Sequence, residues 1–187
     1  MSTTGPPVNR KWRGAALQRT AKMIEVSAPI NLELHFQPTV ELISSTRRYV
    51  CAFFEPFVTD PDLVSRIGLA THELLENILK YAADGRTVTR LDLVEDGDKR
   101  VLSIETTSRI TPERRAGLEE IFTEMANASD ALSYYQLTMG RARHRRHGSG
   151  LGLARVWAEA EMTLSIEFNG DTVSIRAVAN VVDGDES

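Results

Sequence analysis

The segment THELLENILKYA carries polar side chains at spacings that could support phosphoryl chemistry. At about 100° of rotation per helical residue, four of them share one face: Glu73, Asn77, Lys80 and Tyr81. A carboxylate can take a proton from a hydroxyl. An amide oxygen suits Mg²⁺, and an ammonium can neutralise phosphate charge. The alternative is the exposed stripe of a surface helix, in which Glu76 pairs with Lys80 four residues on.

A second motif, GSGLGL at residues 148–153, directly follows the basic run RARHRRH. Its glycines could let the backbone approach a phosphate at the start of a helix, where anions are favoured. A flexible loop that leads into a helix is the alternative. The basic run is either a solvated segment or a source of arginines that fold over a triphosphate.

The elements that must position these groups change in type along the chain. Strand patterns cover 32–38, 87–94 and 100–107, and recur in TLSIEF and TVSIRAVA near the C-terminus. Helical patterns run from Val40 to Phe54, from Asp60-Pro61 to about Ala83, and from GSGLGL onward, while 111–140 is helical or irregular. The turns EDGD and Asn169-Gly170-Asp171 predict hairpins. This order favours an α+β two-layer sandwich, with helices over a mixed, mostly antiparallel sheet.

Composition bounds the class of protein. The 187 residues carry a net charge of −4 and are 42% hydrophobic, which suits one domain with tails. We expect a mobile N-terminal tail over 1–28, the domain over 29–180 and an acidic tail over 181–187. Cys51 is the single cysteine, so no internal disulfide forms, and a buried thiol is expected. No apolar run approaches the ~20 residues of a membrane span, so we expect a cytoplasmic protein.

Taken together, these motifs resemble the ATP-binding domain of the GHKL superfamily, which includes gyrase, histidine kinases and MutL. HELLENILKYA is similar to the N-box of that superfamily, and GSGLGLARVWAE is similar to its second glycine box. The resemblance covers roughly residues 31–179 and implies the Bergerat-type ATP-binding fold, with a lid over about 109–148. The short chain resembles the anti-sigma-factor serine kinase type. The layout from TSRITPE to MGRA is closest to SiaB-like protein kinases.

The resemblance also implies roles for individual residues. Glu73 would be the catalytic residue that orients or deprotonates the nucleophile, and Asn77 would hold Mg²⁺. Lys80 would lie near the phosphates of ATP, and Tyr81 would form a wall of the site. The residues implied to close over the triphosphate are Gly148, Gly150, Leu151 and Gly152.

One part of the pattern is missing. The first glycine box of the family, D-x-G-x-G, has an Asp that binds adenine, but this chain has LSIETTSRITPE at that place. Glu105 is the only nearby carboxylate, and hydroxyls at Thr106, Thr107 or Ser108 could face the base, with Thr107 as the candidate. A hydroxyl cannot reproduce the charged acceptor pair of a carboxylate. Thr172 resembles a threonine that assists at the base; an ordinary strand threonine is the alternative.

The implied function is an Mg-ATP-binding kinase of a partner-switching system, which phosphorylates a serine or threonine of a STAS-type antagonist. A sigma factor is a further implied partner, and a homodimer is the implied assembly. The alternative is a non-catalytic anti-sigma-like interaction module with weak or no nucleotide binding. An ATP-hydrolysing fragment of a larger machine is less favoured because no transducer domain follows. The acidic balance and the lack of aromatic residues among the bases argue against nucleic-acid binding.

Overall fold

The computed structural model describes residues 29–96, 99–142 and 150–181. Its elements are β1 (Ile30–Phe36), α1 (Val40–Phe54), α2 (Pro61–Tyr81), β2 (Thr87–Asp96), β3 (Lys99–Arg109), α3 (Pro112–Ala126), α4 (Ala131–Ala142), α5 (Leu151–Ala158), β4 (Thr163–Asn169) and β5 (Thr172–Val181). The predicted N-terminal tail lies outside the described residues, as does the predicted acidic tail except for Val181. Gly148 and residues 143–147 of the basic run also lie outside them. Among the helices described, none is long and apolar enough to cross a membrane.

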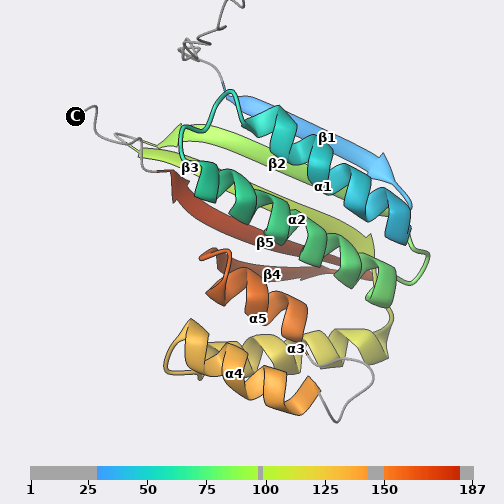
Figure 1. Ribbon diagram of the computed structural model, residues 1–187. Coiled ribbons are helices and arrows are strands. Elements are labelled where there is room, and N and C mark those ends of the chain that lie inside the picture. Colours follow the sequence, from blue (N-terminus) through green and yellow to red (C-terminus); the bar gives the residue numbers. More distant parts are fainter. Residues whose placement is uncertain (1–28, 97–98, 143–149, 182–187) are drawn as a thin grey trace, which may run out of the picture.

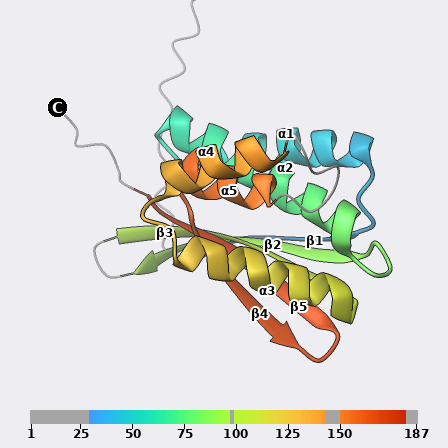
Figure 2. The same ribbon diagram turned by 90° about the horizontal axis from the view of Figure 1, so that it is seen from below.

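The five strands form one sheet in the order β1-β2-β3-β5-β4, and all four pairings are antiparallel. Helices α1, α2 and α5 lie over one face of this sheet, and α4 lies next to α5 (Figures 1 and 2). The predicted α+β sandwich is therefore confirmed. The sheet was expected to be mixed and mostly antiparallel, and its four pairings are all antiparallel. The first strand begins and ends two residues earlier than its sequence pattern predicts.

Period-two alternation separates the two faces of the sheet. The register places Ile104 of β3 between Leu91 of β2 and Ala177 of β5, and all three side chains are buried in the core beneath the helices. One residue on, Glu105 lies between Arg90 and Arg176 on the opposite face. Successive strand residues point to opposite faces, so this outer face is polar where the inner face is apolar.

The two long helices begin where the sequence places capping residues. Thr39 caps α1 through a hydrogen bond from Leu42 N at 3.3 Å, and Asp60 caps α2 through one from Asp62 N at 2.8 Å. The helices approach closely at Gly68, where a Cβ would lie 2.5 Å from Cys51 Sγ. Cys51 is half-buried rather than fully buried, and burial raises the pKa of its thiol.

The stretch expected to be helical or irregular forms the two helices α3 and α4. Leu118 and Met125 of α3 and Tyr134 of α4 are buried members of the central core. The Arg115 guanidinium lies over the Phe168 ring of β4, 4.4 Å from its centroid, which is within cation–π range. Both helices thus share the core of the domain, and their role as a nucleotide lid stays a prediction.

Candidate functional site

The polar face of α2 is turned toward α5. Glu73 is 5% exposed and Asn77 is 8% exposed, although both belong to residue types that are normally found in water. They lie one helical turn apart, as the spacing predicts. Because a buried carboxylate or amide is unfavourable without partners, these two positions require an explanation beyond packing.

The amino end of α5 comes close to both side chains. Gly150 begins this helix with a φ of 69°, a left-handed conformation that glycine adopts without strain. At Gly152, a Cβ would lie 2.8 Å from Glu73 Oε2 and 3.6 Å from Asn77 Oδ1. A side chain at this position would fill the space beside the carboxylate. The glycine motif therefore brings a helix amino end, which favours anions, against the polar face of α2.

Arg155 is the residue of this site that the sequence motifs did not identify. Its Nη1 forms an ion pair with Glu73 Oε1, and its Nε and Nη2 donate to Glu159 Oε2 at 3.1 and 2.9 Å. Arg155 follows Gly152 by three residues, so the two lie on the same side of α5. That spacing was the only feature of the sequence that could have placed Arg155 in the site, because its partner Glu73 is 82 residues away in the sequence.

The electrostatic surroundings of Glu73 favour proton uptake. Burial raises the pKa of the Glu73 carboxyl, and the repulsion of Glu76 adds to it; Arg155, His72 and Lys80 act in the opposite direction. A buried carboxyl with a raised pKa is a better proton acceptor than an exposed one. The site thus has a group suited to general-base chemistry at the amino end of a helix.

Asn77 offers an oxygen that fits a magnesium ligand. Its Nδ2 is buried without a hydrogen-bond partner, so the side-chain amide is not committed to a network through that atom. The described part of the chain contains no group of three or more His, Cys, Asp or Glu side chains that could hold a metal. A single amide oxygen is compatible with Mg²⁺ that takes its remaining ligands from phosphates and water.

Lys80 and Tyr81 lie at the end of α2, further from this centre. The Lys80 ammonium pairs with Glu76 Oε2 at 2.5 Å and is more than half exposed, as the surface-helix alternative expects for this residue. Tyr81 is half-buried, and its carbonyl oxygen accepts a hydrogen bond from Arg114 Nη1 at 2.8 Å. Their contacts with ATP stay predictions, and no described hydrogen bond or ion pair joins either side chain to Glu73 or Asn77.

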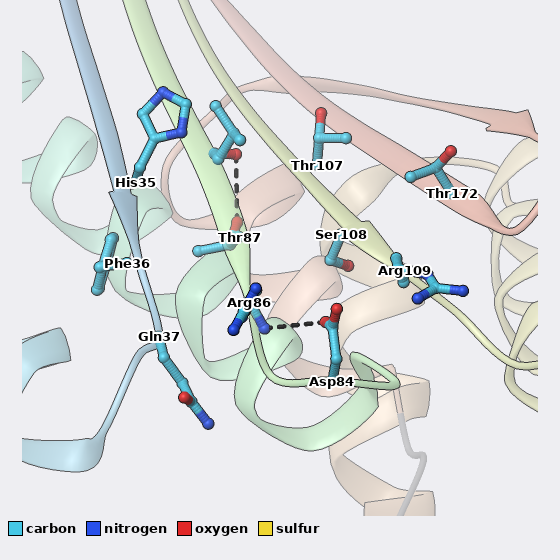
Figure 3. Close-up of a pocket in the computed structure, with 11 residues that line it drawn as sticks. His35, Phe36, Gln37, Asp84, Arg86, Thr87, Thr107, Ser108, Arg109 and Thr172 are labelled. Atoms are coloured by element: carbon cyan, nitrogen blue, oxygen red, sulfur yellow. Dashed lines mark hydrogen bonds between the residues drawn. The ribbon is translucent and has the colours of Figure 1, made fainter.

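Thr107 and Thr172 belong to a different surface. Both line a pocket of about 490 Å³ at the end of the sheet, shown in Figure 3. The Thr107 hydroxyl is 2.8 Å from Ser174 Oγ, and the Thr172 hydroxyl donates to the Asn169 carbonyl oxygen at 2.6 Å. The strand alternation that buries Thr106 and Val173 places both threonines, and Glu105, on the outer face. The structure therefore does not bring them to Glu73 and Asn77, which lie on the helix side.

Thr106 and Ser108 are the candidate hydroxyl residues of β3 that are buried on the helix side, and Thr106 is the more deeply buried. It is 1% exposed, pairs in register with Thr89 of β2, and both hydroxyl oxygens are buried without hydrogen-bond partners. Alternation with Leu102 and Ile104, which are buried on the same strand, was the signal that distinguishes Thr106 from Thr107. The inner face of β3 thus carries a neutral hydroxyl where the resemblance leads one to expect a carboxylate.

This chain is similar to solved structures. The crystal structure of the SiaB–SiaC complex from Pseudomonas aeruginosa contains a chain that aligns with a TM-score of 0.55 and 20% sequence identity, over 79% of this chain and 89% of that one. No protein-family model and no curated protein sequence matches. At this identity, the similarity supports the fold.

Proposed function

We propose that this chain is an Mg-ATP-binding regulatory protein, a serine/threonine kinase of a partner-switching system that phosphorylates a STAS-type antagonist. The observation that carries the proposal is the burial of Glu73 and Asn77 against the glycine-rich amino end of α5. A carboxylate, a magnesium-type oxygen ligand and a helix end that favours anions then meet in one place. These are the groups that phosphoryl transfer needs.

In this proposal the amino end of α5 and the Asn77 side chain bind different parts of Mg-ATP. The amino end of α5 binds the phosphates of ATP, and the absence of a side chain at Gly152 lets this helix end pack directly against Glu73 and Asn77. The Asn77 oxygen would hold Mg²⁺, and the ion would supply positive charge beside the transferring phosphoryl group. Because burial lowers the effective dielectric around Asn77, each of these contacts is stronger than it would be at the surface.

Glu73 then takes the proton of the acceptor hydroxyl. As that hydroxyl oxygen forms its bond to the γ-phosphorus, the bond between the γ-phosphorus and the β,γ-bridging oxygen breaks, and ADP leaves with the electron pair. The proton passes to the Glu73 carboxylate. The raised pKa of Glu73 favours this transfer.

The partner assignment draws support from the structural neighbour. That neighbour was crystallised as a SiaB–SiaC complex, so a protein of this fold class has been seen in an assembly with a partner, and the similarity fits a SiaB-like fold. A STAS-type substrate, a sigma factor as second partner, a homodimer and a cytoplasmic location belong to the same proposal.

A non-catalytic interaction module is the second candidate function, and two observations favour it. Glu73 is already engaged by Arg155. In addition, the inner face of β3 carries Thr106 instead of a carboxylate that could select adenine. A chain of this kind could keep the fold and bind partners with weak or no nucleotide binding.

Titration with a fluorescent ATP analogue, with and without Mg²⁺, separates the two candidates. We expect Mg²⁺-dependent binding by the intact chain, loss of the Mg²⁺-dependent part in Asn77→Ala, and no change in the control Asn180→Ala. Asn180 is an exposed asparagine on β5, so its replacement removes the same atoms away from the site. Incubation with ATP radiolabelled at the γ-phosphate and a STAS-domain protein from the same organism then tests transfer.

The outcomes are distinct. Absence of Mg²⁺-dependent binding at millimolar nucleotide would reject the kinase and leave the interaction module. Binding without transfer, in the presence of the STAS-domain protein, would retain the nucleotide site and reject the substrate. A Glu73→Ala variant that transfers phosphate at the full rate would remove Glu73 from its role.

A further inference from the structure

We propose that Arg155 is a positioning residue that holds the Glu73 carboxylate in place and connects it, through Glu159 and Tyr135, to helix α4. This inference rests on the proposed phosphoryl-transfer function and assigns a role to a residue to which the motifs gave none. It is carried by a continuous set of side-chain contacts that runs from α4 across α5 to α2.

The Arg155 guanidinium bridges two carboxylates. Nη1 donates to Glu73 on α2, while Nε and Nη2 both donate to Glu159 Oε2, four residues further along the chain from Arg155. A guanidinium is rigid and planar, so a partner that binds Nε and Nη2 also sets the direction in which Nη1 points. The orientation of Glu159 therefore determines the direction from which Glu73 is held.

Glu73 is confined from both sides. One of its carboxylate oxygens is bound by Arg155, and the other faces Gly152 at a distance that leaves no room for a Cβ. The residue is 5% exposed, so water does not compete strongly for these contacts. Such confinement suits a proton acceptor, whose geometry relative to the acceptor hydroxyl must be fixed before the reaction.

Tyr135 extends these contacts to α4. Its hydroxyl interacts with the Glu159 carboxylate, which lowers the pKa of that carboxyl, and it also interacts with Arg155. Tyr135 is thus the one residue of α4 with a described polar contact to this pair, and a shift of α4 would change how Glu159 holds the Arg155 guanidinium. The candidate base is thereby coupled to the helix pair in which the lid is expected.

Stability alone does not explain the Glu73–Arg155 pair. Removing a carboxylate from water is costly, and a buried ion pair is often no more stabilising than an apolar pair of the same size. The Arg66 side chain offers the structural comparison: it joins Asp60 and Glu161 by similar contacts, but Asp60 is half-buried and Glu161 exposed, whereas Glu73 is buried. A buried carboxylate that is paired with a half-buried arginine from the last turn of α5 is better explained by a functional role.

Steady-state hydrolysis of Mg-ATP by the full chain tests the proposal, with water in place of the acceptor hydroxyl. We expect Arg155→Met to lower kcat about tenfold or more, because the carboxylate loses its fixed orientation, and to change the KM for ATP much less. Arg155→Lys should recover part of kcat, since an ammonium keeps the charge but cannot bridge both carboxylates. The matched control Arg66→Met should leave kcat and KM unchanged.

A double-mutant cycle tests the link to α4. Tyr135→Phe should lower kcat severalfold in the wild-type background and have no further effect in Arg155→Met, because both changes break the same chain of contacts. Tyr134→Phe is the control: it removes a hydroxyl from the neighbouring position of α4, and the described contacts of that hydroxyl do not include Glu159. Additive effects of Tyr135→Phe and Arg155→Met would overturn the coupling.

The outcomes also separate this inference from the proposed function. An active wild type whose kcat is within twofold of that of Arg155→Met overturns the role of Arg155 alone. Equal losses in kcat and in ATP affinity would show a general structural effect and likewise overturn it. A wild-type chain that neither binds nor hydrolyses Mg-ATP overturns the proposed function, and the role of Arg155 with it.

Discussion

Glu73 and Glu76 lie on the same helix, three residues apart, but their surroundings shift their pKa values in opposite directions. Burial raises the pKa of Glu73. The hydrogen bond from Lys80 lowers the pKa of Glu76, and His72 adds to that effect. The half-exposed Glu76 has a cationic neighbour, Lys80, on its own helix, whereas the cation that contacts Glu73 comes from α5. Position relative to the core therefore decides which carboxylate can act as a base.

These shifts predict opposite pH dependences for two neutral replacements. A raised folded-state pKa contributes stability below the unfolded pKa that is lost as pH rises through the folded pKa. Glu73→Gln should therefore be more stable than wild type at neutral pH, and this gain should fade below the ordinary glutamate pKa of 4.5. A lowered pKa contributes stability above the unfolded pKa that is lost as pH falls through the folded pKa. Glu76→Gln should be less stable at neutral pH, with convergence in acid.

Urea unfolding of the two variants across the acidic to neutral range measures both effects. Each variant is the control for the other, since the substitution and the helix are the same. The assignment would be wrong if both variants shifted the free energy of unfolding in the same direction at neutral pH.

At the scale of the element, α5 depends on its glycines for different reasons. Gly150 supplies the left-handed backbone at the helix start, where Ile121 of α3 packs within 3.3 Å of the position of a Cβ. Gly152 has ordinary helical geometry and serves close approach, because Glu73 lies beside it. The sequence motif identified both glycines. Their different roles became clear only from the packing of α5 against α2 and α3.

Alanine at two helical glycines should have effects of opposite sign. Gly152→Ala should destabilise the protein by about 1–3 kcal/mol, because its Cβ would displace Glu73. It should also weaken nucleotide binding. Gly117→Ala, at an exposed position of α3 with no atom within 4 Å of its Cβ, should stabilise by about 0.5–1 kcal/mol through the unfolded state. Thermal and urea unfolding check both; a neutral Gly152→Ala would contradict the close approach.

Helix faces were easier to predict from sequence than strand faces. The 3.6-residue period of α2 was long and regular, so Glu73 and Asn77 were placed correctly. On β3, Thr107 and Thr106 are adjacent and chemically equivalent, and a shift of one residue moves a side chain to the other face. Arg155 could not be paired with Glu73 from sequence, because that contact depends on how α5 packs against α2.

At the scale of the whole molecule, the order of elements predicted the sandwich, but composition could not predict how α3 and α4 pack. The α3 sequence has only a weak apolar stripe, with Leu118 and Met125 as its buried residues, so it was assigned only as helical or irregular. Tertiary contacts resolve that ambiguity. Tyr134 of α4 packs against Trp157 of α5 with tilted rings whose centroids are 6.0 Å apart, and this contact connects the two helices to the rest of the core.

This shared core predicts that α3 and α4 unfold together with the sheet. Leu118→Ala should lower the free energy of unfolding by about 2–4 kcal/mol, because it removes buried methyl groups and leaves a cavity. Transitions followed by far-UV circular dichroism and by tryptophan fluorescence should stay coincident in urea. The control Leu132→Ala, at a residue of α4 that is 59% exposed, should change stability by less than about 0.5 kcal/mol. A separate early transition, or a near-neutral Leu118→Ala, would show that the two helices form an independent unit attached to the sandwich, as a detachable lid would.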